Sequence, residues 1–318
     1  MNAPSISFLI PAHNEERIIH HALDCLQAIA GPEIEVLVGL DGCTDATKDV
    51  VARYDFVSYV ELDDRGGKPA VLRRLMELTR GQIIIIHDSD WRFVCDREGI
   101  RLLIHEFEDP TLGGIVFPPH NIPFWDLRAG VASQGFVGAG LGVLLLWEYL
   151  LATQAEHTEA GTYADPDHIV YPFTVNVFRR GVIPPATTAA DDFERFMYLI
   201  DAGYRVKVFD DRRLPYFQIT DQRLSFRDHF RQRVKNHIAR AQLASAVKFE
   251  ATPWNFYLPF TWYCLKNARR LGRGDFILVV TWYVTILLAL LRARLILRKG
   301  TLSARDAWRY RLTRHVLD

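Results

Sequence analysis

Two aspartates, Asp88 and Asp90, alternate around Ser89 directly after the apolar run Ile83 to Ile86. A turn at this place can bring both carboxylates to one cation, and carboxylate oxygens suit a hard ion such as Mg²⁺ or Mn²⁺. For an isolated pair of this kind, the alternative is two solvated turn aspartates. The position of the pair behind an apolar run favours the metal site.

Apolar runs bounded by turn residues recur in the N-terminal part of the chain and predict buried parallel strands. Apolar residues between them have helical spacing, as in Ile18 to Leu26 and Val71 to Leu78. This alternation predicts an open α/β sheet. The four runs are Ile6 to Ile10, Ile34 to Leu40, Val57 to Leu62 and Ile83 to Ile86.

Polar segments follow three of these runs, where a parallel sheet binds its ligands. They are Pro11 to Glu15, Asp41 to Asp45 and His87 to Asp90, and we expect them to converge on one edge of the sheet. A further acidic segment, Asp191 to Glu194, opens a predicted helix that ends before Gly203.

Several motifs in this order resemble family 2 of the inverting glycosyltransferases, which has the GT-A fold. Ile10 to Glu16 resembles the opening strand and loop of that family, and Asp41 to Thr47 resembles its DDGSTDGT segment, with Leu40 in place of the first aspartate. The remaining matches are Gly66 to Ala70 with the GKxxAL loop, His87 to Asp90 with the metal-binding DxD, Asp191 to Glu194 before Ala202-Gly203-Tyr204 with the ED motif, and Gln232 to Asn236 with a degenerate QRxRW.

The resemblance implies a role for each matching position. Asp192 falls on the catalytic base, and Asp88 and Asp90 fall on the metal ligands, with Asp41 near the nucleotide base. For Asp192 the alternative is helix capping, and both roles are compatible. For Gln232 to Asn236 the alternative is a solvated basic helix. The donor-binding positions are Pro11, Ala12, Asn14, Glu15, Asp41, Gly67, Lys68, Asp88, Ser89, Gln232, Arg233 and Lys235.

The chemistry that the resemblance implies is inverting transfer of a sugar from a UDP- or GDP-sugar to a hydroxyl, or alternatively a phosphate, of a membrane-borne glycan or lipid-linked acceptor. A phosphate acceptor is already an anion and would need the base Asp192 less. One rival is a nucleotidyltransferase, which would carry a glycine-rich loop where this chain has Ala12 to Glu15. The other rival is a non-catalytic membrane scaffold of the same fold. The departures at Leu40, Asp191 and Asn236 motivate it, but the acidic residues that the chemistry needs are present.

Charge is distributed unevenly, although the whole chain is formally neutral. The segment Arg212 to Asp318 carries 21 Lys and Arg against 6 Asp and Glu. Together with its apolar runs, this excess predicts contact with an anionic membrane surface. Nucleic acid is not expected as a partner, because the aromatic residues there cluster with aliphatic ones.

The apolar run Phe276 to Leu291 is shorter than a membrane is thick, since its residues cover only about 24 Å of a hydrocarbon core of about 30 Å. We therefore favour interfacial or re-entrant helices, with a single span as the alternative. The N-terminus lacks a basic signal region, and the four cysteines form no CxxC pair. These features predict a protein at the cytoplasmic face of the membrane.

The predicted domains are a catalytic GT-A domain over residues 1–246 and a membrane-associating helical region over residues 247–318. Within the catalytic domain, residues 1–117 are expected to bind the donor and residues 118–246 the acceptor.

Overall fold

The computed structural model describes residues 5–117, 137–184, 190–208, 215–219, 226–246, 253–271 and 273–298. The chain forms two compact units. Unit 1 comprises Met1–His120, Phe173–Thr187 and Asp191–Thr220, and unit 2 comprises Asn121–Pro172, Thr188–Ala190 and Asp221–Asp318. These units are defined by contacts alone, and the functional boundary near residue 246 stays a prediction.

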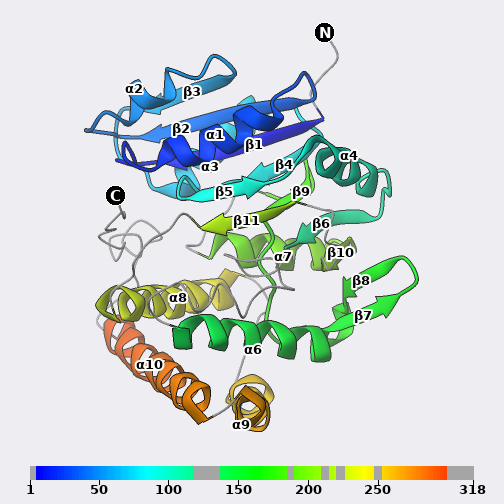
Figure 1. Cartoon of the computed structure of the whole chain (residues 1–318), viewed down its shortest axis with the longest axis vertical. Helices are drawn as coiled ribbons and strands as arrows, with labels where there is room; N and C mark the ends of the chain where they lie inside the picture. The colour runs from blue at the N-terminus through cyan, green and yellow to red at the C-terminus, as the bar shows by residue number, and fades with distance from the viewer. Residues whose placement is uncertain are drawn as a thin grey trace. The chain divides into compact units, whose positions relative to one another are not determined.

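The sheet of unit 1 contains the four strands that the apolar runs predicted (Figure 1). They are β1 (Ile6–Ala12), β2 (Ile34–Asp41), β3 (Val57–Leu62) and β4 (Ile83–Ile86), all paired in parallel in the order β3-β2-β1-β4. The prediction that all four are buried was wrong for β3. Because β3 is an edge strand that pairs only with β2, three of its residues, Ser58, Tyr59 and Glu61, are exposed to solvent.

The sheet continues beyond β4 with strands of mixed direction. Strand β9 (Val177–Arg179) pairs antiparallel with both β4 and β6 (Leu112–Val116), and β10 (Arg205–Val208) pairs parallel with β6. A separate antiparallel pair joins β5 (Trp91–Val94) to β11 (Tyr216–Ile219). Unit 1 is therefore a mixed α/β structure in which parallel pairs dominate.

Helices of unit 1 cover the sheet with the apolar faces that the helical spacing predicted. Helix α1 (Ile19–Ile29) buries Ile19, Ala22, Leu23, Leu26 and Ile29, and α3 (Lys68–Leu78) buries Val71, Leu72 and Leu75. Helix α3 lies close against β2 at Gly39, where an added Cβ would come within 2.2 Å of Val71 Cγ1. The other helices are α2 (Thr47–Val51), α4 (Arg97–Glu106) and α7 (Asp191–Asp201).

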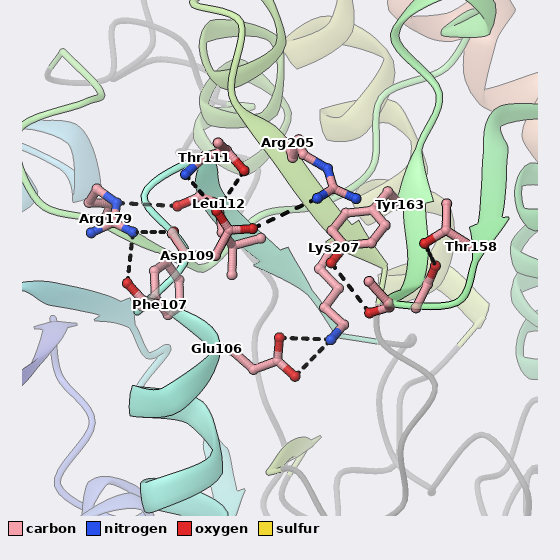
Figure 2. Close-up of polar contacts among 12 residues, drawn as sticks. Glu106, Phe107, Asp109, Thr111, Leu112, Thr158, Tyr163, Arg179, Arg205 and Lys207 are labelled. Atoms are coloured by element: carbon pink, nitrogen blue, oxygen red, sulfur yellow. Dashed lines mark hydrogen bonds and ion pairs between the residues drawn. The ribbon is translucent and has the colours of Figure 1, made fainter.

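Cations from β9 and β10 hold the end of α4 (Figure 2). Arg179 donates hydrogen bonds to the carbonyls of Phe107, Asp109 and Leu112 at 2.7 to 3.2 Å. Lys207 Nζ lies 2.7 Å from both carboxylate oxygens of Glu106. These contacts tie the end of α4 and the loop that leads into β6 to strands β9 and β10, so the corner is structural.

Unit 2 is built mainly from helices. They are α6 (Val137–Gln154), α8 (Phe226–Ala246), the π-helical turn η3 (Pro253–Tyr257), α9 (Leu258–Leu271) and α10 (Arg273–Leu297). Between α6 and α8 lie the hairpin β7 (Ala155–Thr158) and β8 (Gly161–Ala164) and the short helix η2 (Pro166–His168). Helix α10 packs against α6, α8 and α9.

Helix α10 is longer than the apolar run that predicted it, because the helix continues through Arg292 and Arg294. Its 25 residues correspond to about 37 Å at 1.5 Å per residue. Within it, Val280–Leu297 is long and apolar enough to cross a membrane, with a mean hydropathy of 1.7 and only 22% of the segment buried. The helix is therefore long enough to cross a membrane, whereas the apolar run Phe276 to Leu291 alone is not.

Candidate active site

The loops that follow β1 and β2 are tied together by side chains. Asn14 has a left-handed backbone (φ 55°), a conformation that asparagine tolerates better than most residues, and its Oδ1 accepts a hydrogen bond from Thr44 N at 2.8 Å. The N–H of Glu15 donates to Thr47 Oγ1 at 2.8 Å. His13 Nδ1 lies 2.5 Å from the carbonyl oxygen of Asp41. The polar segments after these two strands therefore meet, as the sheet-edge argument predicted.

Asp41 holds the loop that leads into α3. Its Oδ1 accepts the N–H of Gly66 at 2.6 Å, and its Oδ2 accepts the N–H of Gly67 at 2.9 Å. Gly67 is the residue before α3 and has a φ of 83°, which strongly favours glycine. Asp41 thereby fixes the backbone at the start of α3, where Lys68 is the first residue. Its predicted contact with the nucleotide base stays a prediction.

Lys68 joins the two acidic motifs of unit 1. Its Nζ lies 2.8 Å from Asp88 Oδ1 and 3.5 Å from Asp191 Oδ2, and its side chain is only 12% exposed. Burial alone lowers the pKa of an ammonium group, but the carboxylates of Asp191 and Asp88 outweigh burial here and raise the pKa of Lys68. Lys68 therefore stays charged at physiological pH.

Asp191 is a buried member of an ion-pair network. Arg195 NH1 lies 2.6 Å from Asp191 Oδ2, and the same guanidinium donates to the Val175 carbonyl at 2.7 Å and to Asn176 Oδ1 at 2.8 Å. Burial raises the pKa of Asp191, but the charges of Lys68 and Arg195 more than offset burial and lower the pKa. Asp191 is thus ionised and held in place by two cations.

Asp192, the predicted base, has the opposite electrostatic environment. Burial raises the pKa of Asp192, and the neighbouring charge of Asp191 raises it further. Its Oδ1 accepts the N–H of Phe193 at 3.0 Å, at the start of α7. Two adjacent carboxyl groups therefore have pKa values shifted in opposite directions, an arrangement that suits one group to hold charge and the other to exchange a proton.

The DxD turn lies between β4 and β5. Ser89 and Asp90 are buried in it, whereas the Asp88 side chain is 33% exposed. His87 is fully buried, with its ring edge-to-face against Phe8 and Phe217. Burial lowers the pKa of His87 to about 4, and both ring nitrogens lack a hydrogen-bond partner among the described residues. His87 is therefore neutral and packs behind the turn.

The donor set of this turn fits a divalent cation bound together with a ligand. The described His, Cys, Asp and Glu residues contain no group of three that could hold a metal by themselves. Asp88 and Asp90 would supply two hard oxygen ligands, leaving the other positions to phosphate oxygens and water.

The other predicted donor residues, Gln232, Arg233 and Lys235, lie on α8 in unit 2. All three are half-buried. Burial lowers the pKa of Arg233 to about 10. Their contacts with a donor stay predictions. Pro11 and Ala12 form the carboxyl end of β1.

Sequence reasoning missed Arg195 and Asn176, which orient Asp191. The signal that could have found Arg195 is its spacing of four residues from Asp191, which places the two side chains on the same face of a helix. No comparable signal exists for Asn176, because its approach to Arg195 depends on the tertiary fold.

Comparison with known proteins supports the identification from motifs. Residues 7–131 match the family described as Glycosyl transferase family 2. Glycosyltransferase AglD of Haloferax volcanii is 31% identical over 147 residues, which are 42% of this chain and 23% of that protein. The probable glycosyltransferase YdaM of Bacillus subtilis is 33% identical over 96 residues, 27% of this chain and 23% of that protein. The chain thus matches about a quarter of the length of these relatives.

Solved structures share the fold. A mannosyltransferase from Pyrobaculum calidifontis in complex with GDP-Man and Mn²⁺ superposes with a TM-score of 0.57 at 18% identity, covering 93% of this chain and 87% of that one. TarS residues 1–349 of S. aureus in complex with UDP-GlcNAc superposes with a TM-score of 0.51 at 17% identity, covering 77% and 68%. The chain therefore has a GT-A fold, and residues 7–131 within it match the glycosyl transferase family 2 model.

Proposed function

We propose that this protein is an inverting, metal-dependent glycosyltransferase that moves a sugar from a UDP- or GDP-sugar to a membrane-borne glycan or lipid acceptor. The observation that carries the proposal is the position of Lys68. Its ammonium group lies within ion-pair distance of both Asp88 and Asp191, so the predicted metal and base motifs meet on one side chain. The match of residues 7–131 to the glycosyltransferase family supports the same reading.

Donor binding is assigned to the carboxyl ends of β1, β2 and β4. The loops containing Asn14, Glu15 and Asp41 are interlocked and so are preorganised for a nucleotide. Lys68 supplies a positive charge at the start of α3, where the helix dipole also favours a phosphate. A divalent ion held by Asp88 and Asp90 would supply charge neutralisation at the leaving diphosphate.

Asp192 is assigned as the general base. Its raised pKa brings a carboxyl group closer to neutral pH, where proton transfer is efficient. Arg195 keeps Asp191 ionised and in place, and Asp191 in turn raises the pKa of Asp192. Direct attack by the acceptor hydroxyl then releases the nucleotide diphosphate and inverts the anomeric carbon.

The exposed surface of unit 2 is the reason for assigning a membrane-borne acceptor. Large apolar side chains on η3, α9 and α10 are exposed, among them Trp254, Trp262 and Leu288. Exposed arginines, Arg292, Arg294 and Arg298, lie at the end of α10. Apolar and cationic surface together favour an anionic membrane, and the cytoplasmic face is proposed. One relative, from Staphylococcus epidermidis, is named a poly-β-1,6-N-acetyl-D-glucosamine synthase.

Transfer assays with a panel of UDP- and GDP-sugars, with Mn²⁺ or Mg²⁺, test the proposal. With a hydroxyl acceptor, Asp192→Asn should lower kcat by about 10²- to 10⁴-fold, the usual contribution of a positioned base. Asp201→Asn, at the exposed end of the same helix, is the matched control and should leave kcat unchanged. Retention of the anomeric configuration in the product would contradict the direct displacement.

A further inference from the structure

Lys68 contacts an oxygen that the predicted metal would need. Its Nζ atom lies 2.8 Å from Asp88 Oδ1, the distance of a direct charge-assisted hydrogen bond. Two cations on one carboxylate repel each other, and the double charge of a divalent ion doubles that repulsion. The Lys68 side chain is only 12% exposed, so solvent screens the repulsion less than it would at the surface. Lys68 in this position therefore weakens the affinity of Asp88 for a metal.

The chain offers the metal few ligands to make up for this loss. No group of three His, Cys, Asp or Glu residues that could hold an ion is found in the described part of the chain. On the DxD turn the acidic residues are Asp88 and Asp90, and the first of them is paired with Lys68. The affinity of an oxygen site for a divalent ion rises with the number of charged ligands. By itself, this turn should therefore bind a metal weakly.

Lys68 can leave Asp88 without losing all of its negative neighbours. Asp191 Oδ2 lies 3.5 Å from Lys68 Nζ, so it remains close to the ammonium group when the contact with Asp88 is broken. Asp191 in turn is held by Arg195, whose NH1 lies 2.6 Å from the same oxygen. A buried charge without an opposite charge is costly, and Asp191 limits this cost. The ion pair between Lys68 and Asp88 is therefore exchangeable.

Only the side chain of Lys68 has to move in such an exchange. Its backbone opens α3 directly after Gly67, and Asp41 accepts the N–H groups of Gly66 and Gly67 at 2.6 and 2.9 Å. The lysine stem is flexible, and its ammonium group is a compact charge that can pair with a carboxylate or a phosphate. A diphosphate carries more negative charge than one carboxylate, so it attracts the ammonium group more strongly.

We propose that Lys68 is an exchange residue. It pairs with Asp88 until the nucleoside diphosphate of the donor binds, and it then transfers its ammonium group to the phosphates and leaves Asp88 to the divalent ion. This inference rests on the proposed transferase function and adds an order of assembly to it. The metal is bound tightly only together with a donor, when there is a leaving group whose charge it can neutralise.

Calorimetric titration of the full chain with Mn²⁺ alone tests the exchange without donor or turnover. Lys68→Met removes the ammonium group and keeps an unbranched side chain, so this variant should bind Mn²⁺ at least tenfold more tightly than the wild type. Arg65→Gln removes a cation from an exposed position in the loop before α3 and is the matched control, which should bind Mn²⁺ as the wild type does. Damage to the fold would not produce a gain in metal affinity.

The same titration with UDP or GDP present measures how strongly the nucleotide and the metal are coupled. In the wild type, the nucleotide supplies oxygen ligands to the metal and also removes Lys68 from Asp88. In Lys68→Met only the first effect remains, so the nucleotide should raise the affinity for Mn²⁺ by a smaller factor than in the wild type. Lys68→Gln loses the charge but keeps a hydrogen-bond donor, and this second variant should change both quantities in the same direction.

Two results would overturn the exchange. One is an affinity for Mn²⁺ alone that is unchanged in both Lys68→Met and Lys68→Gln. The other is nucleotide binding by the wild type that is equally tight with Mn²⁺ and with a chelator, because Lys68 would then replace the metal and not yield Asp88 to it. A wild type that binds no donor would count against the proposed function, while the titrations with Mn²⁺ alone would still decide whether Lys68 and the metal compete for Asp88.

Discussion

Asp191 and Asp192 are adjacent in sequence but differ in what surrounds them. Asp191 faces the cations Lys68 and Arg195, so its charged form is stabilised, while the half-buried Asp192 lies beside that charge. For Asp191 the folded-state pKa is below the unfolded value of 3.8, so its contribution to stability is present above pH 3.8 and is lost as pH falls through the folded pKa. For Asp192 the folded-state pKa is above 3.8, so this residue costs stability. The cost is absent below pH 3.8 and grows as pH rises through the folded-state pKa.

The charge of Asp191 should therefore set the pH dependence of the reaction. In Asp191→Asn, the negative neighbour of Asp192 is removed, so the pKa of Asp192 falls and the acid limb of the kcat profile moves to lower pH. Kinetic pH profiles of the wild type and of Asp191→Asn measure this shift. Asp201→Asn serves as the control and should keep the wild-type profile. Movement of the acid limb to higher pH in Asp191→Asn would contradict the assigned coupling.

Residue types and their spacing predicted much of the candidate site, because the sheet-edge rule needs only the order of strands and polar segments. Asp41, Lys68 and Asp88 each follow from that rule or from the family resemblance. Arg195 did not, since its importance lies in contacts with Val175 and Asn176, which are brought to it by the fold.

At the scale of elements, unbroken apolar runs predicted β1, β2 and β4 because each strand is covered on both faces. Strands β5 and β11 mix polar with apolar residues over four residues each, so they form neither an apolar run nor a recognisable period. The end of α10 was underestimated because Arg292 and Arg294 interrupt the apolar run while the helix continues through them. Arg292 and Arg294 are exposed on α10, so the helix can carry their charges without ending.

Packing of α6 against α10 depends on the absence of a side chain at Gly142. In Gly142→Ala the new methyl group would lie within 2.5 Å of three atoms of the Trp282 ring, so the helices must separate or the ring must turn. We expect a loss of about 1 to 3 kcal/mol in the free energy of unfolding, although alanine favours helix. Denaturant unfolding measures this loss.

A double-mutant cycle provides the control for this prediction. Trp282→Leu removes the large ring, so Gly142→Ala should cost less in that background than in the wild type. An equal cost in both backgrounds would show that Gly142 does not act through Trp282.

At the scale of the whole molecule, the exposed apolar side chains of unit 2 should bring the protein to anionic membranes. Trp262→Ser and Leu288→Ser together should reduce co-sedimentation with vesicles containing phosphatidylglycerol severalfold, because each change removes apolar surface from the bilayer contact. Leu78→Ser, which alters an exposed leucine of unit 1, is the matched control. Sedimentation that is unaffected by the double change would argue against this surface.

The most direct test of the proposed transferase is metal-dependent donor binding measured by calorimetry. We expect the wild type to bind one UDP- or GDP-sugar in the presence of Mn²⁺ and Asp88→Asn to weaken this binding at least tenfold. The control Asp55→Asn, at an exposed loop position, should bind like the wild type. A folded wild type that binds no donor with the metal present, or an Asp88→Asn variant with undiminished affinity, would contradict the proposed function.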